Sequence, residues 1–171
     1  MIKAINTFYN GHYFRSRTEA RWAVYFDTLG VKWLYEVEGY ELGDGVRYLP
    51  DFYFPDFDFY LEVKRENFGD SDLPRWKEFV MQSQKSLVIM EGLPMVDKLG
   101  ALLEIQYGQV LHTEGIFIFG HITGKDVFYA GNLYDYSEIY QEAVIAARCA
   151  RFEFLDNQQT KSQHENNQIQ R

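Results

Sequence analysis

Cysteine is nearly absent from this sequence of 171 residues, since Cys149 is the only one. A single cysteine excludes an intramolecular disulfide framework and a zinc site built on several thiolates. Long apolar runs are also missing, because no stretch approaches the roughly 20 apolar residues of a membrane-spanning helix. Residues 1–14 lack the apolar segment of a secretory signal peptide. We therefore expect a protein with no membrane partner that works in a reducing compartment, the cytoplasm.

Positive charge is scarce as well, because 17 Lys and Arg face 25 Asp and Glu and leave a net charge of −8. Most proteins that bind a DNA duplex tightly present a basic surface, so this composition counts against tight DNA binding by the chain alone. A bound divalent cation reverses the local field at a carboxylate cluster, so the composition does not exclude metal-dependent cleavage. Residues 1–30 depart from the average, with four basic side chains against two acidic ones: Lys3, Arg15, Arg17 and Arg21 against Glu19 and Asp27.

Aromatic residues are abundant, at 18% of the chain, and favour strands and a core of wide, stiff side chains. We find no internal repeat and no interdomain linker, so we expect one domain over residues 1–155. Residues 156–171 are polar, with no aromatic residue and no periodicity. We expect this tail to be disordered.

Hydrophobic periodicity and turn signals predict an α/β fold. The pattern Ser16-Arg17-Thr18-Glu19 has the spacing of a capping box, and it opens a helix that continues to Leu29 and ends at Gly30. Asp72 and Pro74 have the residue types that open a helix. The other expected elements are strands at 33–42, 46–54 and 57–65, helices at 73–85, 96–107 and 138–154, a strand at 86–90, and a hairpin of 116–121 with 127–130.

The second and third expected strands place acidic residues together. If residues 55–58 form the loop of a hairpin, Asp51 lies directly opposite Glu62, with Cβ atoms about 5 Å apart. The third strand alternates, so that one side carries Phe57, Phe59, Leu61 and Val63 and the other Asp58, Tyr60, Glu62 and Lys64. Lys64 therefore shares a face with both acids.

Two carboxylates on one sheet face repel each other unless a positive charge lies between them. A hard cation such as Mg²⁺ suits this arrangement, because it prefers oxygen ligands. A lysine beside the metal is placed to orient the attacking water and to neutralise charge on a phosphate. The spacing thus predicts a hydrolytic site from Asp51, Glu62 and Lys64.

Pro50-Asp51, ten further residues and then Glu62-Val63-Lys64 resemble the PD-(D/E)XK signature of the restriction-endonuclease-like nucleases. Residues 14–36 and 48–55 also resemble a small bacterial and phage subgroup of that superfamily. The resemblance implies an αβββαβ core, with a mixed central sheet flanked by helices, over about residues 12–92. It also implies cleavage of DNA with Mg²⁺ or Mn²⁺, in the bacterial host cytoplasm if a phage encodes the chain.

The resemblance implies a role for each matched residue. Asp51, Glu62 and the Val63 carbonyl would hold the metal ion, and Lys64 would orient the attacking water. Glu19 stands on the first helix, where members often carry a further acid, and would bind the metal through water or hold a second ion. Gln82 and Gln84 are candidates for a polar residue that members place on the following helix.

Each of these residues also has a structural interpretation. Glu19 is the third helical residue of a capping box, which stability alone explains. Glu62 and Lys64 fit an exposed sheet face, and Asp51 fits a turn after Pro50. Together, however, these interpretations leave the facing geometry unexplained, and we favour the site.

Arginines precede and follow Glu19 closely in the sequence. Arg15, Arg17 and Arg21 stand near a helix N-terminus, where anions bind, so Arg15 and Arg17 are candidates for contacts with substrate phosphates. Ordinary surface arginines are an equally good interpretation.

Two functions from different classes follow. The first is a Mg²⁺- or Mn²⁺-dependent endonuclease that hydrolyses DNA phosphodiesters. The second is a non-catalytic module of the same fold that binds a protein or nucleic acid, for example a phage-encoded inhibitor or a subunit of a complex. A homodimer or protein partner that supplies DNA recognition is compatible with the first.

Overall fold

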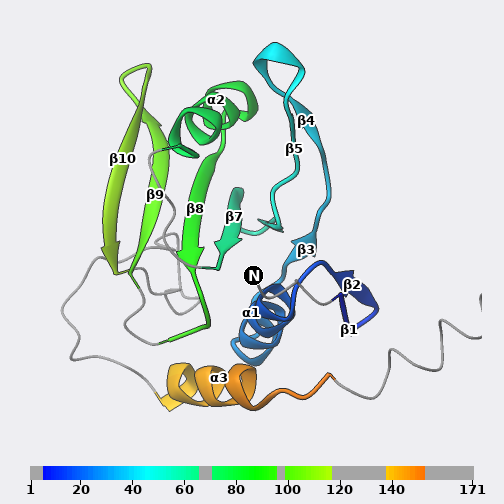
Figure 1. Ribbon diagram of the computed structural model, residues 1–171. Helices are drawn as coiled ribbons and strands as arrows, with labels where there is room; N and C mark the ends of the chain where they lie inside the picture. Colours follow the sequence, from blue (N-terminus) through cyan, green and yellow to red (C-terminus); the bar gives the residue numbers. More distant parts are fainter. Residues whose placement is uncertain (1–5, 66–70, 96–98, 117–137, 153–171) are drawn as a thin grey trace, which may run out of the picture.

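The computed structural model describes residues 6–65, 71–95, 99–116 and 138–152, and within these ranges it is an α/β structure with a mixed sheet (Figure 1). The two expected strands after residue 116 and the polar tail lie almost wholly outside the described residues. In chain order the elements are β1 (Thr7–Tyr9), β2 (His12–Phe14), α1 (Arg17–Thr28), β3 (Leu34–Tyr35), β4 (Tyr40–Glu41), a short 3-10 turn (Gly43–Gly45), β5 (Arg47–Tyr48), β6 (Phe52–Phe54), β7 (Phe59–Lys64), α2 (Leu73–Ser83), β8 (Ser86–Glu91), β9 (Leu99–Gln106), β10 (Gln109–Ile116) and α3 (Glu138–Cys149).

The main sheet has six strands in the order β10-β9-β8-β7-β6-β3. All neighbouring strands are antiparallel except β7 and β8, which are parallel and are joined through α2. A parallel pair requires such a crossover, whereas antiparallel neighbours can be joined by a short turn, as β6 and β7 are. The predicted order of helix, three antiparallel strands, helix and strand is confirmed over α1, β3, β6, β7, α2 and β8.

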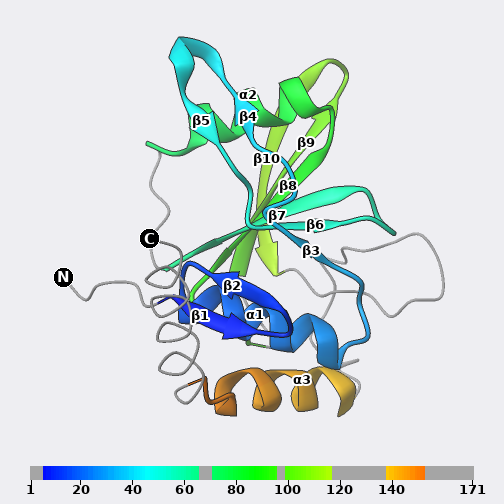
Figure 2. The same ribbon diagram turned by 90° about the vertical axis from the view of Figure 1, so that its right-hand side faces the viewer.

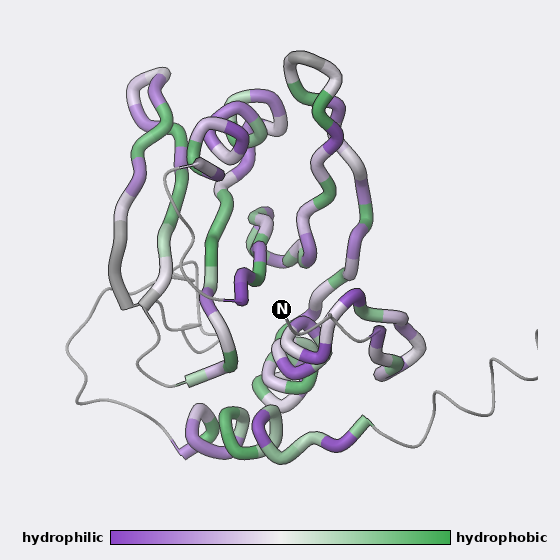
Figure 3. The backbone as a smooth tube through the Cα atoms, in the orientation of Figure 1, coloured by the Kyte–Doolittle hydropathy of each residue, from purple (hydrophilic) through white to green (hydrophobic). Residues whose placement is uncertain are grey.

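Helices cover both faces of the sheet. On one face α1 and α3 pack over inward side chains of β6, β7 and β8, in a core that includes Phe52, Leu61 and Val88. On the other face α2 packs over Tyr60, Leu87 and other residues of the same strands. Figure 2 shows α1 and α3 side by side on one side of the strands and α2 on the other. The strand β8 is coloured as hydrophobic along most of its length, which fits a central strand covered on both faces (Figure 3).

Two of the expected long strands are each broken in two. Residues 33–42 form β3 and β4, and Glu36 between them has a φ of 47°. Residues 46–54 form β5 and β6, separated at positions 49–51, where Pro50 has no N–H for a strand ladder. The outer halves, β4 and β5, pair with each other in a separate two-stranded ribbon. The prediction of two continuous strands was therefore wrong, because the local backbone turns the chain out of the sheet.

The predicted helix at 96–107 is also wrong. Residues 99–106 form β9, which pairs with β8 on one side and with β10 on the other. Tyr107 and Gly108 both have positive φ, 52° and 76°, as a two-residue type I′ hairpin turn requires. Helix-forming residues such as Leu102, Leu103 and Glu104 suggested a helix, but pairing on both sides outweighs local propensity. The strand β10 was not predicted.

Other boundaries agree more closely with expectation. The helix α1 begins after Ser16, whose side chain accepts a hydrogen bond from the Glu19 N–H, as the capping box predicted. The helix α2 is confirmed with a proline in its first turn, although the Asp72 side chain makes no capping bond. The helix α3 ends at Cys149, five residues before the predicted end.

Asp27 ties the β1–β2 hairpin to α1. Its carboxylate accepts hydrogen bonds from the Tyr9 hydroxyl at 2.9 Å, the Asn10 side chain at 3.1 Å and the Trp33 indole at 2.7 Å. Burial, together with the Asp27 hydrogen bond, raises the pKa of Tyr9 to about 12. One carboxylate thereby fixes the position of the segment that leads into Arg15 and α1.

We expect Asp27→Ala to lower the free energy of unfolding by about 1–3 kcal/mol, because it leaves partly buried donors without their acceptor. Asp56→Ala is the matched control, since Asp56 is exposed and no hydrogen bond links it to another described residue. Urea unfolding followed by tryptophan fluorescence measures both variants. Equal midpoints for the two variants would show that the Asp27 bonds contribute nothing.

Candidate active site

The acidic residues meet where β7 ends. In the β6–β7 hairpin Phe52 pairs with Leu61 and Phe54 with Phe59, so the predicted register is confirmed. Continuing this register by one residue sets Asp51 opposite Glu62, although Asp51 itself lies in the bend before β6. One oxygen of the Asp51 carboxylate accepts the Val63 N–H at 2.8 Å. This bond holds the carboxylate against the end of β7.

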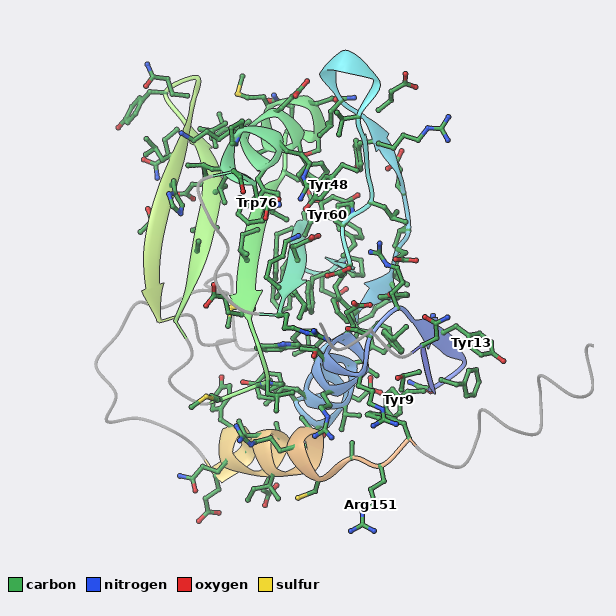
Figure 4. All side chains as sticks on the ribbon, viewed as in Figure 1. Tyr9, Tyr13, Tyr48, Tyr60, Trp76 and Arg151 are labelled. Carbon is green, nitrogen blue, oxygen red and sulfur yellow. The ribbon has the colours of Figure 1, made fainter. Side chains whose placement is uncertain are left out.

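Glu62 and Lys64 lie on the sheet face under α2. Lys64 Nζ is 2.8 Å from Glu62 Oε1, and the Tyr48 hydroxyl donates to Glu62 Oε2 at 3.0 Å. Lys64 Nζ also lies 5.6 Å from the centre of the Trp76 ring of α2. Tyr48 of β5 and Trp76 of α2, both labelled in Figure 4, belong to the buried cluster on this face of the sheet. Glu62 is only 7% exposed, so its interpretation as a solvated sheet residue was wrong.

Glu19 reaches the site from the first turn of α1. Its carboxylate accepts hydrogen bonds from the Tyr35 hydroxyl at 2.6 Å, the Ser16 hydroxyl at 2.7 Å and the Arg15 N–H at 3.1 Å. The capping role expected from the sequence is therefore real. Capping does not account for the burial of the carboxylate, since a capping glutamate at a surface helix remains hydrated, whereas Glu19 is 8% exposed.

The three carboxylates influence one another. Burial raises the pKa of Asp51 well above its usual value, and the negative charges of Glu62 and Glu19 raise it further, against the opposing effects of the Val63 N–H and Arg15. Burial and the charge of Glu62 likewise raise the pKa of Tyr48. The buried polar or charged residues of the described chain are Thr7 and these three acids. Glu62 and Glu19 thus lie near enough to Asp51 for their charges to act on its carboxyl group.

The chemistry of these residues fits a hard divalent cation. All three side chains offer carboxylate oxygens as metal ligands. Such a cation would also offset the repulsion from Glu62 and Glu19 that contributes to the raised pKa of Asp51. In their present rotamers, however, the carboxylates turn toward protein donors. Among the described residues, no group of three or more His, Cys, Asp or Glu side chains is arranged to hold a metal ion.

The three arginines near the start of α1 differ in their partners. Arg15 forms an ion pair with Asp51, at 2.9 Å between Nη2 and Oδ1, and a second one with Glu36. Arg17 is exposed, and no hydrogen bond or ion pair links it to another described residue. Arg21 donates to the carbonyls of Ala147 and Arg148 at the end of α3. Its role is thus to bind the carboxyl end of a neighbouring helix.

The polar candidates on α2 lie away from the acids. The Gln82 side chain donates to the Glu41 carbonyl of β4 at 3.2 Å. Gln82 is six residues beyond Trp76, about 9 Å along the helix. Gln84 has a left-handed conformation and ends α2. No contact between described residues joins either glutamine to the carboxylates.

Tyrosines and a further arginine complete the site, and the sequence reasoning missed them. The Tyr35 hydroxyl donates to Glu19, and the Tyr48 hydroxyl donates to Glu62. Arg75 of α2 lies over the Tyr48 ring, with its Cζ atom 5.3 Å from the ring centre. Regular alternation would place Tyr48 on the same face as Phe52, but the two belong to opposite faces because the chain bends between them. A Pro50 in an expected strand was the available signal for this bend.

Compared with known proteins, the chain matches no family model and no curated protein sequence. Within the described ranges, no helix combines the length and apolarity needed to cross a membrane.

We expect Asp51→Asn to unfold at a higher temperature than the wild type at neutral pH. The pKa of Asp51 is higher in the folded state than its unfolded value of 3.8, so ionisation of this buried carboxyl costs stability above the folded pKa. The cost declines as the pH falls below the folded pKa and is lost at the unfolded pKa of 3.8, where the two unfolding temperatures converge. Thermal scans in metal-free buffer across this pH range measure the difference. A difference independent of pH would contradict the assignment to Asp51.

Proposed function

We propose that this protein is a nuclease that hydrolyses DNA phosphodiester bonds with Mg²⁺ or Mn²⁺, on a core like that of the restriction endonucleases. The observation that carries this proposal is the burial of Glu19, Asp51 and Glu62 together, with the Lys64 ammonium beside them. The order of the elements around the site, from α1 to β8, agrees with the core that the sequence resemblance implies.

Stability does not explain three acids at this position. Taking a carboxylate out of water costs free energy, and paired charges in a protein interior are often no more stable than apolar residues of similar size. The raised pKa of Asp51 expresses this cost, because burial and two like charges act against its ionised form. Groups with such perturbed pKa values concentrate at functional sites.

Asp51 and Glu62 would hold the divalent cation, together with the Val63 carbonyl, and Glu19 would act through water or bind a second ion. When bound, such a cation supplies positive charge that polarises the phosphate and makes a water molecule more acidic. The role of the acids is to fix the position of that charge relative to Lys64.

Lys64 is suited to orient the attacking water and to receive developing negative charge. Its ammonium is held by Glu62 and lies over the Trp76 ring, while a quarter of the side chain, 25%, remains exposed. Arg15 pairs with Asp51, and its side chain is 56% exposed, so it is suited to contact a phosphate. These cations partly compensate for the acidic surface of the chain near the substrate.

The second candidate is a non-catalytic module that binds a protein or nucleic acid. The observations in its favour are the net charge of −8 and the fact that each acid is already paired with donors of the protein itself. A phage-encoded inhibitor or a subunit of a larger complex would fit this alternative. A homodimer or another protein that supplies DNA recognition is compatible with the nuclease proposal instead.

Cleavage of plasmid and linear DNA in the presence of Mg²⁺, Mn²⁺ or EDTA tests the proposal. We expect Lys64→Ala to reduce the cleavage rate about 10²–10⁴-fold, because it removes the cation that acts on water and phosphate. Asp51→Ala is expected to abolish metal-dependent cleavage. Lys85→Ala is the matched control, since Lys85 pairs with Asp58 beyond the opposite end of β7. Wild-type activity in Lys64→Ala and Asp51→Ala, or none in the wild type, would favour the non-catalytic module.

Tyr48→Phe tests the support of Glu62 separately. The variant removes one hydroxyl that donates to Glu62 Oε2 and leaves the aromatic packing intact. We expect cleavage to fall about 10–100-fold, as when outer hydrogen-bond partners of metal ligands are removed. Tyr53→Phe is the matched control, because its hydroxyl contacts Asp58 instead. If both variants cleave alike, the Tyr48 bond does not position Glu62 for catalysis.

A further inference from the structure

Arg15 bridges two carboxylates at the edge of the site. Its guanidinium contacts Asp51 Oδ1 at 2.9 Å and also pairs with Glu36. The two ends of this bridge differ in exposure, because the Arg15 side chain is 56% exposed and the Asp51 side chain only 5%. The cation is therefore in contact with solvent while the anion that it neutralises is buried.

The backbone of Arg15 is anchored to the same site. Its N–H donates to Glu19 Oε2 and to the Tyr35 hydroxyl oxygen, each at 3.1 Å. The Tyr35 hydroxyl in turn donates to Glu19 at 2.6 Å. Because the backbone is fixed and the side chain is long and exposed, the guanidinium can leave Asp51 without displacing α1 or the β1–β2 hairpin.

Arg15 and a divalent cation compete for Asp51. One oxygen of the Asp51 carboxylate accepts the Val63 N–H, and the other is the oxygen that Arg15 contacts. A metal ion at Asp51 must approach this second oxygen, where it meets a positive charge at close range. In a partly buried site two like charges a few ångströms apart repel each other strongly, because little water screens them. Metal binding therefore favours departure of the guanidinium.

A phosphodiester offers the displaced guanidinium an anion of suitable geometry, because arginine binds phosphate oxygens through two parallel hydrogen bonds. We propose that Arg15 is an exchangeable counter-ion, which neutralises Asp51 in the empty site and transfers to a substrate phosphate when Asp51 takes up a divalent cation. This inference rests on the proposed function and adds its regulation: metal and DNA bind cooperatively.

The coupling is reciprocal, since two ligands that displace the same internal contact favour each other's binding equally. DNA that draws Arg15 away raises the affinity for metal, and metal that expels Arg15 raises the affinity for DNA. Without DNA, the chain keeps its acids neutralised and binds metal weakly. This behaviour agrees with carboxylates that are all paired with protein donors.

Isothermal titration of the full chain with Ca²⁺, in the absence and presence of a short DNA duplex, tests the exchange at one fixed pH of about 8, well above the ordinary pKa of a carboxyl group. For the wild type we expect the duplex to tighten Ca²⁺ binding about 5–150-fold, the usual range of such coupling. For Arg15→Gln we expect tighter Ca²⁺ binding without DNA and a coupling of less than about twofold. For Arg15→Lys we expect a Ca²⁺ affinity and a coupling between those of the wild type and Arg15→Gln. The lysine ammonium keeps the charge but cannot bridge two carboxylates as the planar guanidinium does.

Arg151→Gln is the matched control, since it removes the same charge from an exposed position beyond the end of α3, away from the proposed site. It is expected to retain the wild-type coupling. If Arg15→Gln binds Ca²⁺ no more tightly than the wild type without DNA, or keeps the full coupling, the exchange is overturned while the nuclease proposal stands. If the wild type binds no divalent cation and cleaves no DNA, the proposed function fails, and the exchange fails with it.

Discussion

Three carboxylates are held out of water at the end of β7, and the surrounding structure is arranged around this concentration of negative charge. Asp51 shows its effect most directly, because burial and the charges of Glu62 and Glu19 all raise its pKa. The groups that contact the three carboxylates are specific: the backbone N–H groups of Val63 and Arg15, the hydroxyls of Ser16, Tyr35 and Tyr48, and the cations of Arg15 and Lys64. Each donor satisfies one carboxylate without removing the repulsion among the three. A divalent cation would reduce this repulsion, which is the physical basis of the metal site that we propose.

The fold brings these groups from both helical layers to one strand end. The N-terminus of α1 contributes Glu19 and the adjacent Arg15, and the bend after Pro50 presents Asp51. The other layer contributes Trp76 and Arg75 from α2 and Tyr48 from the ribbon strand β5. The ribbon therefore has a definite role at the site, because without the break between β5 and β6 the Tyr48 hydroxyl would lie on the opposite face from Glu62. The Asp27 hydrogen bonds fix the β1–β2 hairpin that precedes Arg15, and they thereby help to position Arg15 at the site.

Much of the arrangement of α1, β6 and β7 was predictable from local sequence patterns. The capping box at Ser16 gave the start of α1, the loop at residues 55–58 gave the register of β6 with β7, and alternation gave the two faces of β7. These features depend on contacts close in sequence, where residue type and spacing carry the information. The strand β9 was not predictable in the same way, because its leucines and glutamate suit a helix and only pairing with β8 and β10 makes them a strand. The breaks at Glu36 and Pro50 depend likewise on where the chain must leave the main sheet.

The sequence by itself determined which acids and which lysine stand at the candidate site, and that Asp51 faces Glu62, because a hairpin register follows from loop length and alternation. Only the tertiary structure decided which partners each acid has. Tyr35, Tyr48 and the guanidinium of Arg15 reach the carboxylates across 14 to 36 residues of sequence. Such contacts arise when α1, the ribbon and α2 pack around the end of β7, and no local pattern encodes them. The physical reason is that a buried carboxylate must be hydrogen-bonded or paired with a cation, and the groups available for this are those that the packing of helices and strands brings close to it.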